Sequence, residues 1–441
     1  MHNLRKLLLK CALALLLMVV VALIMGYTKI GQGAAVAGCL AFALGMGAVD
    51  RLKGYQYTAW IITAVVTGMV YPDAFLQWGE FDLRNKWLIL IVVQGVMFGM
   101  GIQMSLRDFS NLGSTGKGVL VGLLSQFSIM PLVGFMLTKV FDFDPEIAAG
   151  IILMGACSSG LASNVMVYLA RANLVLSVTV TAMATMLAPL MTPFWMKTLA
   201  GTLIDIEFFG MMMNIIKIVL VPIGAALLHD YLKMAPKNYK NGIYWVAGML
   251  AGYLLVLPFG LWDYFATSFS PPVLQSMEIF SFFMGAIVFG AFYHVCTRWI
   301  KQLDKWMPYV SMFGIVYFTT VTTAAGRDNL LQVGGLLFMA SVIHNGLGYF
   351  FGYRLSRLLG LDVPSARSMA LEVGLQNGGM ASGLAGSMGK LGTVGLAPAV
   401  FSPWMNISGS ILANYWRKKS LKEEERDVDE VPESLSTNYI D

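Results

Sequence analysis

Long apolar stretches separated by short polar segments make up nearly the whole chain. Apolar runs of about 18 or more residues with few charges are typical of membrane-spanning helices, and roughly fourteen such runs occur. The predicted spans are 8–26, 33–49, 57–72, 87–105, 118–139, 146–170, 174–198, 209–229, 242–260, 276–296, 307–325, 330–352, 366–388 and 393–415. The runs are continuously apolar rather than alternating, which argues against a β-barrel. The pattern predicts an all-α polytopic membrane protein.

The composition agrees with this pattern. Apolar residues make up 57% of the 441 residues and charged residues 12%, whereas soluble domains carry about 25% charged residues. The basic residues also alternate between loops, which orients the chain. With the N-terminus inside, the inner loops hold Arg51, Lys53, Arg107, Lys117, Arg171, Lys233, Lys237, Lys240, Arg298, Lys301, Lys305, Arg354, Arg357 and Arg367. The outer loops hold only Lys29, Arg84, Lys86, Arg327 and Lys390. We expect the protein to lie in the inner membrane of the cell, with both termini in the cytoplasm.

Both ends of the chain raise a question of processing or order. Arg5 and Lys6 precede an apolar run, as in a cleaved signal peptide. The run from Leu7 to Met25 is long enough to span the membrane and a second run follows, which favours a retained helix. The C-terminal segment 417–441 is too polar to bury a core, so we expect a short helix followed by disorder.

The four cysteines, Cys11, Cys39, Cys157 and Cys296, lie in or beside apolar runs without CxxC spacing. We interpret them as small buried residues, neither disulfide-bonded nor metal-binding. The four histidines form no HExxH pattern, so no zinc site is expected.

A carboxylate stands inside one of the apolar runs, in SMALEVGLQNGGMASGLAGS (368–387). A charge at the centre of a bilayer costs a few kcal/mol, so Glu372 either snorkels to the headgroups or has a function. Glu372 and Gln376 are four residues apart and would share one face of a helix. Gly374, Gly378 and Gly379 then weaken the helix.

A second polar segment lies in the run 155–189. Ser158, Ser159, Ser163 and Asn164 fall in mid-span, and the next span offers Ser177 and Thr181, four residues apart. Ser and Thr in membrane helices usually bond to their own backbone. Two broken, Gly-rich segments far apart in the chain are instead typical of transporters with inverted repeats. Their carboxylate, amide and hydroxyl oxygens suit a hard cation such as Na⁺, and no thiolate or imidazole joins them to hold a soft metal.

Four other polar residues lie within spans. Gln126 precedes Pro131 and can face the same site. Lys217 is expected to snorkel or to pair inside the bundle. His344 and Asn345 are interpreted as helix-packing residues.

At these residues the chain resembles the bile acid:sodium symporter family, also called the SBF family. The matching stretches are FGMGIQMSLRDF (98–109), SQFSIMPLVGF (125–135), GLASNVMVYLARANLVLSVTVT (160–181), IHNGLGYFFGY (343–353), LEVGLQNGGMASGLA (371–385) and NISGSILANYW (406–416). The ASN and EVGxQN motifs, in this order, are the most specific part of the resemblance.

The resemblance implies a core of ten helices in two inverted repeats of five, divided into a panel domain and a core domain. The fourth helix of each repeat is broken, and the two cross near the midplane; here they would be 146–170 and 366–388. About four additional helices would remain. The implied divisions are an N-terminal helix pair (1–55), the first repeat with the sixth core helix (56–232), an inserted helix pair (233–304), the rest of the second repeat (305–416) and the polar tail (417–441).

The resemblance also implies two Na⁺ sites and a substrate site. One Na⁺ site would use Ser163, Asn164, Ser177, Thr181 and Glu372. The other would use Gln126, Glu372, Gln376 and the backbone carbonyls of Val373 and Leu375. The expected substrate contacts are Ser158, Ser159, Asn377 and Asn406. The chain departs from the family pattern at Leu161, where members often carry Thr, and at Met405, where they often carry His.

These observations predict a sodium-coupled symporter of an organic anion, bile-acid-like or a small carboxylate, working by alternating access. One alternative is an organic anion facilitator without Na⁺ coupling, which the complete ligand set disfavours. Another is a membrane sensor that binds ligand without moving it. An enzyme is disfavoured because no nucleophile–base pair or metal motif is present. The expected partners are Na⁺, the anion and the lipid bilayer, with no nucleic acid; the oligomeric state stays open.

Overall fold

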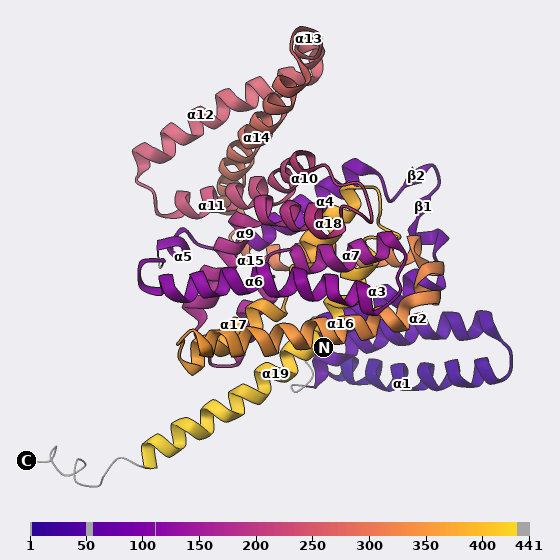
Figure 1. Ribbon diagram of the computed structural model, residues 1–441. Coiled ribbons are helices and arrows are strands. Elements are labelled where there is room, and N and C mark those ends of the chain that lie inside the picture. The colour runs from indigo at the N-terminus through magenta and orange to yellow at the C-terminus, as the bar shows by residue number, and fades with distance from the viewer. Residues whose placement is uncertain (1, 50–55, 111, 430–441) are drawn as a thin grey trace, which may run out of the picture.

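The computed structural model describes residues 2–49, 56–110 and 112–429, and these are almost entirely helical (Figure 1). In chain order the elements are α1 (His2–Ile24), α2 (Thr28–Gly45), η1 (Met46–Ala48), α3 (Gln56–Val70), η3 (Asp73–Phe75), β1 (Gln77–Trp78), β2 (Phe81–Asp82), α4 (Lys86–Gly101), α5 (Leu106–Ser110), α6 (Leu112–Val140), α7 (Pro145–Ala156), α8 (Leu161–Leu169), α9 (Leu174–Trp195), η4 (Met196–Ala200), α10 (Phe208–Ile215), η5 (Ile216–Leu220), α11 (Val221–Met234), α12 (Lys237–Val256), η6 (Leu257–Phe259), α13 (Leu261–Ser268), α14 (Pro271–Trp299), α15 (Leu303–Ala325), α16 (Arg327–Leu358), α17 (Val363–Gly374), α18 (Gly378–Ser387) and α19 (Leu396–Asp429). The strands β1 and β2 form one short antiparallel hairpin.

Eight of the described helical segments are long and apolar enough to cross a membrane: His2–Ile24, Thr28–Ala48, Thr115–Val140, Leu174–Ala200, Phe208–Met234, Lys237–Phe259, Pro271–Trp299 and Arg327–Leu358. Shorter apolar helices, among them α4 and α7, add to these. The prediction of an all-α polytopic membrane protein is confirmed. The ten-helix inverted-repeat core stays a prediction.

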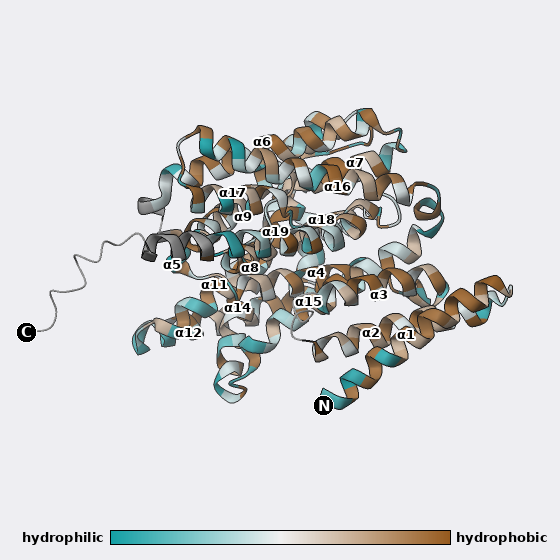
Figure 2. Ribbon diagram, turned by 90° about the horizontal axis from the view of Figure 1, so that it is seen from below, coloured by the Kyte–Doolittle hydropathy of each residue, from teal (hydrophilic) through white to brown (hydrophobic). Residues whose placement is uncertain are grey.

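The N-terminal helices α1 and α2 form an antiparallel pair along one side of the molecule (Figure 1). They pack closely because α2 presents glycines to α1: a Cβ at Gly38 would lie 3.3 Å from the Cβ of Leu15. The rest of α1 is uncovered, and only Ala12 and Ala22 are buried. Figure 2 shows apolar residues along most of α1, as a helix facing lipid requires.

The segment 233–304, which we call the inserted segment, contains α12, α13 and α14 and projects from the body of the molecule (Figure 1). Only Ala247 of α12 is buried. The attachment to the body is through α14, which packs on α11. Gly290 allows this contact, because a Cβ there would lie 2.6 Å from the carbonyl oxygen of Ala225. Farther along α14, Glu278 Oε1 lies 2.7 Å from Lys217 Nζ, so Lys217 pairs inside the bundle.

All four cysteines are free. Cys157 is buried and Cys39 and Cys296 are half-buried, but Cys11 is exposed. The interpretation of Cys11 as a buried residue is therefore wrong, because it lies on the face of α1 that no other helix covers. Among the residues that the structure describes, no cluster of three or more His, Cys, Asp or Glu side chains is arranged to hold a metal ion.

The last helix differs from its expected division into a span and a tail. α19 runs without interruption from Leu396 to Asp429, through Pro403, and extends away from the body (Figure 1). The expected short helix after residue 417 is thus the continuation of the span. The disorder expected near the C-terminus falls on 430–441, outside the described residues.

Candidate functional site

Two helices are interrupted in the middle of the molecule. α7 ends at Ala156 and α8 begins at Leu161, and α17 ends at Gly374 and α18 begins at Gly378. We call the connecting residues 157–160 the first break and 375–377 the second break. The backbone is extended at both, with φ −96° and ψ 155° at Gly160 and φ −107° and ψ 90° at Leu375. The spans 146–170 and 366–388 are therefore discontinuous.

The two breaks are joined by backbone hydrogen bonds. Ser159 and Gln376 form an antiparallel bridge. The amide of Gly160 donates to the carbonyl of Leu375 at 2.9 Å, and the amide of Asn377 donates to the carbonyl of Ser158 at 2.8 Å. A broken helix exposes polar backbone groups that cannot stay unpaired inside a membrane. Each break supplies the partners that the other needs, so the two helices cross at this point.

Side chains from α16 and α19 hold the second break in place. Asn345 Nδ2 donates to the carbonyl of Gly374 at 2.7 Å, at the end of α17. Ser408 donates to Asn345 Oδ1, and Tyr349 and Ser408 are 3.1 Å apart through their hydroxyls. Asn345 is thus a packing residue, as the sequence indicated, but what it packs against is the free end of a broken helix. On the other side of the break, Asn377 Oδ1 caps α18 by accepting from the amide of Met380 at 3.0 Å.

Glu372 is fully buried two residues before the end of α17. Three hydroxyls donate to its carboxylate: Ser163 Oγ at 2.6 Å, Ser177 Oγ, and Thr181 Oγ1 at 2.8 Å. Ser163 comes from α8, and Ser177 and Thr181 are one turn apart on α9. Among the described residues, no Lys, Arg or His forms an ion pair with Glu372. The carboxylate is therefore surrounded by hydroxyls, and no cationic side chain of the described residues balances its charge.

Asn164 completes this first cluster. Its Oδ1 lies 2.8 Å from Ser177 Oγ and 3.2 Å from Thr181 Oγ1, the two hydroxyls of α9 that donate to Glu372. The five residues Ser163, Asn164, Ser177, Thr181 and Glu372, which the sequence grouped together, thus lie in one hydrogen-bonded cluster. Their oxygens come from α8, α9 and α17, so the cluster requires both broken helices.

A second cluster lies at the end of α17 and in the second break. Gln126, fully buried on α6, donates from Nε2 to Gln376 Oε1 at 2.7 Å and to the carbonyl of Cys157 at 3.0 Å. Gln376 Nε2 donates to the carbonyl of Val373 at 2.6 Å. Gln126 Oε1 is buried without a hydrogen-bond partner in the described part of the chain. The structure thus brings Gln126, Gln376 and Val373 together, while the carbonyl of Leu375 pairs with the first break.

The four expected substrate residues are distributed unequally. Ser158 and Ser159 are fully buried in the first break, and Asn377 is buried in the second. Asn377 Nδ2 has no hydrogen-bond partner among the described residues. Asn406 instead donates back to the carbonyl of Ser402 in its own helix at 2.8 Å. The crossing brings three of the four together, and Asn406 lies on the adjoining helix α19.

Sequence reasoning missed the close contact of α19 with the second break. The amide of Gln376 lies 3.4 Å from the sulfur of Met405, and a Cβ at Gly378 would lie 2.0 Å from Ser402 Oγ. In the sequence, Met405 stands out only as a departure from the family pattern. Its neighbour Ser402 carried no signal, because a serine in an apolar helix usually bonds to its own backbone, as Ser402 also does at 2.6 Å.

The second broken helix packs on α4 through a row of glycines. Gly379, Gly383 and Gly386 lie along one face of α18 because they are spaced four and three residues apart. A Cβ at Gly383 would lie 2.3 Å from Val93 Cγ2, and one at Gly386 would lie 2.8 Å from Ile89 Cγ2. The absence of side chains thus lets α18 lie directly on α4.

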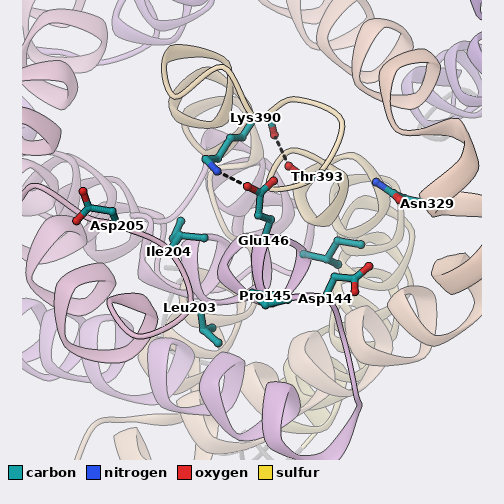
Figure 3. A pocket seen from close by; sticks show the side chains of 10 residues that line it. Asp144, Pro145, Glu146, Leu203, Ile204, Asp205, Asn329, Lys390 and Thr393 are labelled. Atoms are coloured by element: carbon teal, nitrogen blue, oxygen red, sulfur yellow. Dashed lines mark hydrogen bonds and ion pairs between the residues drawn. The ribbon is translucent and has the colours of Figure 1, made fainter.

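A cavity of about 470 Å³ opens beside the start of α7 and the segment that follows α18, the ends of the two broken helices away from the breaks (Figure 3). Glu146, in the first turn of α7, forms an ion pair with Lys390, which follows α18. Asp144 and Asp205 also line this cavity. The start of α7 and the segment after α18 are therefore linked by a pair of opposite charges.

An all-α membrane protein with two crossing broken helices and buried oxygen-rich clusters belongs to the class of membrane transporters. Comparison with known proteins agrees. The model of the sodium bile acid symporter family matches residues 88–265. Over 377 residues the chain is 31% identical to the uncharacterized sodium-dependent transporter YocS of Bacillus subtilis (strain 168), covering 85% of this chain and 95% of that protein. The chain belongs to the sodium bile acid symporter family.

Other relatives carry related names. The chain is 29% identical over 376 residues to the probable chloroplastic sodium/metabolite cotransporter BASS1 of Arabidopsis thaliana, covering 85% of this chain and 76% of that protein. It is 25% identical over 296 residues to the ileal sodium/bile acid cotransporter of Homo sapiens, covering 66% of each. The family resemblance is confirmed. The protein is a transporter rather than an enzyme, and its relatives support Na⁺ as the coupling ion.

Proposed function

We propose that the protein is a symporter that couples Na⁺ entry to the uptake of a small organic anion by alternating access. The names of its relatives, which are sodium-dependent, sodium/metabolite and sodium/bile acid transporters, support the coupling ion and the kind of cargo. The observation that carries the proposal is Glu372, a fully buried carboxylate that is surrounded by hydroxyls and forms no ion pair with a cationic side chain in the described part of the protein.

The first proposed Na⁺ site consists of Ser163, Asn164, Ser177, Thr181 and Glu372. A hydroxyl that donates its proton still has lone pairs to offer to a cation, and hard cations prefer oxygen ligands. A bound Na⁺ balances the buried charge of Glu372, which is otherwise costly in a membrane interior. Na⁺ binding therefore stabilises the contact of α17 with α8 and α9.

The second proposed Na⁺ site consists of Gln126, Gln376 and Glu372 with the backbone carbonyls of Val373 and Leu375. Its support is the buried Gln126 Oε1, which has no partner in the described residues, because a buried polar atom without a partner is costly and an ion offsets that cost. Glu372 serves both ions in this proposal, so its removal weakens both sites.

The anion site is proposed at the crossing, with Asn377, Ser158 and Ser159 as contacts and Asn406 on the adjoining helix. The helices α8 and α18 both begin at the breaks. The N-terminus of a helix carries a partial positive charge that favours an anion. Asn377 Nδ2 is a buried donor without a partner among the described residues. These features support a carboxylate, either bile-acid-like or small.

The first experiment measures thermal stability of the purified protein in NaCl and in KCl at equal ionic strength. A ligand that binds only the folded state raises stability in proportion to the logarithm of its concentration over Kd. We expect Na⁺ to stabilise the wild type and to have no such effect on Glu372→Gln. Equal stability of the wild type in both salts would favour a facilitator without Na⁺ coupling.

A second experiment tests transport itself. The protein is reconstituted in liposomes and the uptake of labelled carboxylates is followed with an inward Na⁺ gradient, with an equal K⁺ gradient and with no gradient. We expect accumulation only with the Na⁺ gradient. Binding of a carboxylate without any uptake would instead identify a membrane sensor.

A further inference from the structure

A row of polar side chains follows one face of α9, beginning with the residue that caps the helix. Asn173, Ser177, Thr181 and Thr185 are spaced four residues apart, so they lie along one face. Ser177 and Thr181 bond to Glu372 in the first proposed Na⁺ site, and Asn173 and Thr185 lie one turn beyond them at either end. The polar face of α9 therefore continues past this site in both directions.

α17 carries a matching row. Ser368 lies four residues before Glu372, about 6 Å nearer the start of the helix. Ser368 Oγ lies 2.9 Å from the carbonyl oxygen of Asn173, one turn away from the hydrogen bond that Ser177 donates to Glu372. Asn173 Nδ2 also donates to Ser365 Oγ at 3.0 Å. We call Asn173, Ser365 and Ser368 the Asn173 contact; it joins α9 and α17 at the ends where both helices begin.

The Asn173 contact lies between the buried site and the surface. Glu372 and Ser368 are fully buried, Ser365 is 8% exposed and Asn173 is half-buried. The buried cluster where α6 packs on α9 and α17 is apolar instead, and consists of Val119, Val121, Leu176, Val180, Leu361 and Met369. A cation that leaves the first proposed site between α9 and α17 therefore finds oxygen ligands on the side of Asn173, whereas the side of α6 offers hydrocarbon.

We propose that Na⁺ passes between the first proposed site and the cytoplasm along α9 and α17, and that the Asn173 contact is the gate on this route. The inference rests on the proposed function, because it requires Na⁺ at Glu372. When the start of α17 moves away from α9, the oxygens of Asn173 and Ser368 no longer bond to each other. They then become ligands for a passing Na⁺, since hard cations bind carbonyl and hydroxyl oxygens. In the predicted orientation this end is cytoplasmic, because Arg171 precedes it.

The charges at this end make the Asn173 contact a passage rather than a third binding site. Both α9 and α17 begin here, and the N-terminus of a helix carries a partial positive charge that disfavours a cation. Arg171 is exposed beside the contact, while Arg367 donates to Ser420 of α19 at 2.7 Å. The carboxylate of Asp362 caps α17 by accepting from the amide of Ser365 at 3.1 Å. Loss of the contact should therefore change the rate of Na⁺ exchange and leave the affinity of the first site unchanged.

The test measures how fast Na⁺ reaches its site from each side of the membrane. Inside-out and right-side-out vesicles are prepared from cells with and without the protein, and the charge movement after a jump in Na⁺ concentration is recorded on a solid-supported membrane. Asn173→Ser keeps the cap of α9, because serine caps a helix as well as asparagine does, but removes the amide that donates to Ser365. We expect this variant to speed the charge movement by about 10-fold in inside-out vesicles, the effect of one hydrogen bond lost from a barrier. In right-side-out vesicles the rate should equal that of the wild type.

Two further variants make the test specific. Ser365→Ala removes the same hydrogen bond from the side of α17, so it should act as Asn173→Ser does, and the double variant should be no faster than either alone. Asn85→Ser is the matched control, because Asn85 also caps a helix, α4, by accepting from the amide of Trp87 at 2.9 Å. It should leave the rate unchanged in both kinds of vesicle.

The outcomes separate the gate from the proposed function. A wild type without Na⁺-dependent charge movement in either kind of vesicle would overturn both. A wild-type movement whose rate is unchanged in Asn173→Ser, or raised only in right-side-out vesicles, would overturn the gate alone. So would a lower Na⁺ affinity of Asn173→Ser in a Na⁺ titration of thermal stability, because Asn173 would then support the site itself and not the route.

Discussion

The two broken helices have the same design but different chemistry. Each consists of two short helices joined by an extended break, and each break pairs with the backbone of the other. The second carries a carboxylate, Glu372, and two amides, Gln376 and Asn377. Near its break, the first carries only hydroxyls and one amide, Asn164. Charge is thus concentrated in one broken helix, while the other supplies neutral oxygens for it.

Because of this difference, neither helix can form the proposed cation site alone. The hydroxyl of Ser163 meets Glu372 only where the helices cross. Any movement that separates them would leave a buried carboxylate without its partners, which is costly. Cation binding is therefore expected to stabilise the contact between the two broken helices, and this contact is expected to raise the affinity for the cation, as linkage requires.

The largest expected effect comes from removing the charge. Glu372→Gln should lower Na⁺ affinity by roughly 100-fold or more, because contacts to a charged group are worth about 1.5–3 kcal/mol and both proposed sites share this one. A Na⁺ titration of thermal stability measures it. Moving the charge to the first broken helix, with Asn164→Asp added to Glu372→Gln, should restore part of the affinity. No recovery at all would mean that the position of the charge matters more than its presence.

The next effect tests the neutral oxygens. Thr181→Val removes one of the hydroxyls that donate to Glu372, with little change in the shape of the side chain. It should lower the affinity for Na⁺ by about 10-fold, which corresponds to one modest hydrogen bond. Thr198→Val is the matched control, since that exposed hydroxyl bonds only to the carbonyl of Phe194 in its own helix. Equal Na⁺ affinity in the two variants would argue against Thr181 as a ligand.

A third prediction separates the two proposed ions. Gln126→Leu removes the amide whose oxygen has no partner in the described chain, and leaves the hydroxyl cluster of Glu372 intact. We expect the dependence of uptake on Na⁺ concentration to become less steep, with a Hill coefficient that approaches one. An unchanged slope would indicate that Gln126 only supports the backbone of Cys157, to which it also donates.

The smallest effect is expected at the ends of the broken helices away from the breaks, where α7 starts and α18 ends. Glu146→Gln removes the ion pair with Lys390, and both side chains are more than a third exposed. Exposed ion pairs contribute about 0–1 kcal/mol, so thermal stability should fall only slightly, and Lys390→Gln should behave alike. A large fall in thermal stability would show that this ion pair matters as much to the fold as the crossing does.

Much of the crossing could be predicted from the sequence, because its chemistry is unusual for a membrane. Glu372 and the serines around residues 158–163 stand out against apolar neighbours. The breaks themselves were visible only as weakened helices, since glycine also serves ordinary helix packing. The hydrogen bonds between residues 158–160 and 375–377 join segments more than two hundred positions apart, and no local pattern encodes them.

The Asn173 contact was not predictable in the same way. Asn173 caps α9, while Ser365 and Ser368 lie on α17, and each has an unremarkable local sequence. The exposure of Cys11 was missed for a related reason. An apolar run indicates burial in the bilayer or in the protein, and only the packing of helices distinguishes the two.

The pairing of Ser159 with Gln376 has a consequence for how such chains can change over generations. Substitutions in the two breaks leave the backbone hydrogen bonds between them intact. A change in the number of residues in either break does not. One residue gained or lost in either break shifts the partners on the other helix and turns every following side chain of that half-helix by about 100°, one residue's share of a helical turn. New cargoes should therefore arise by substitution in these breaks and never by insertion, and libraries aimed at altered selectivity should keep their length fixed.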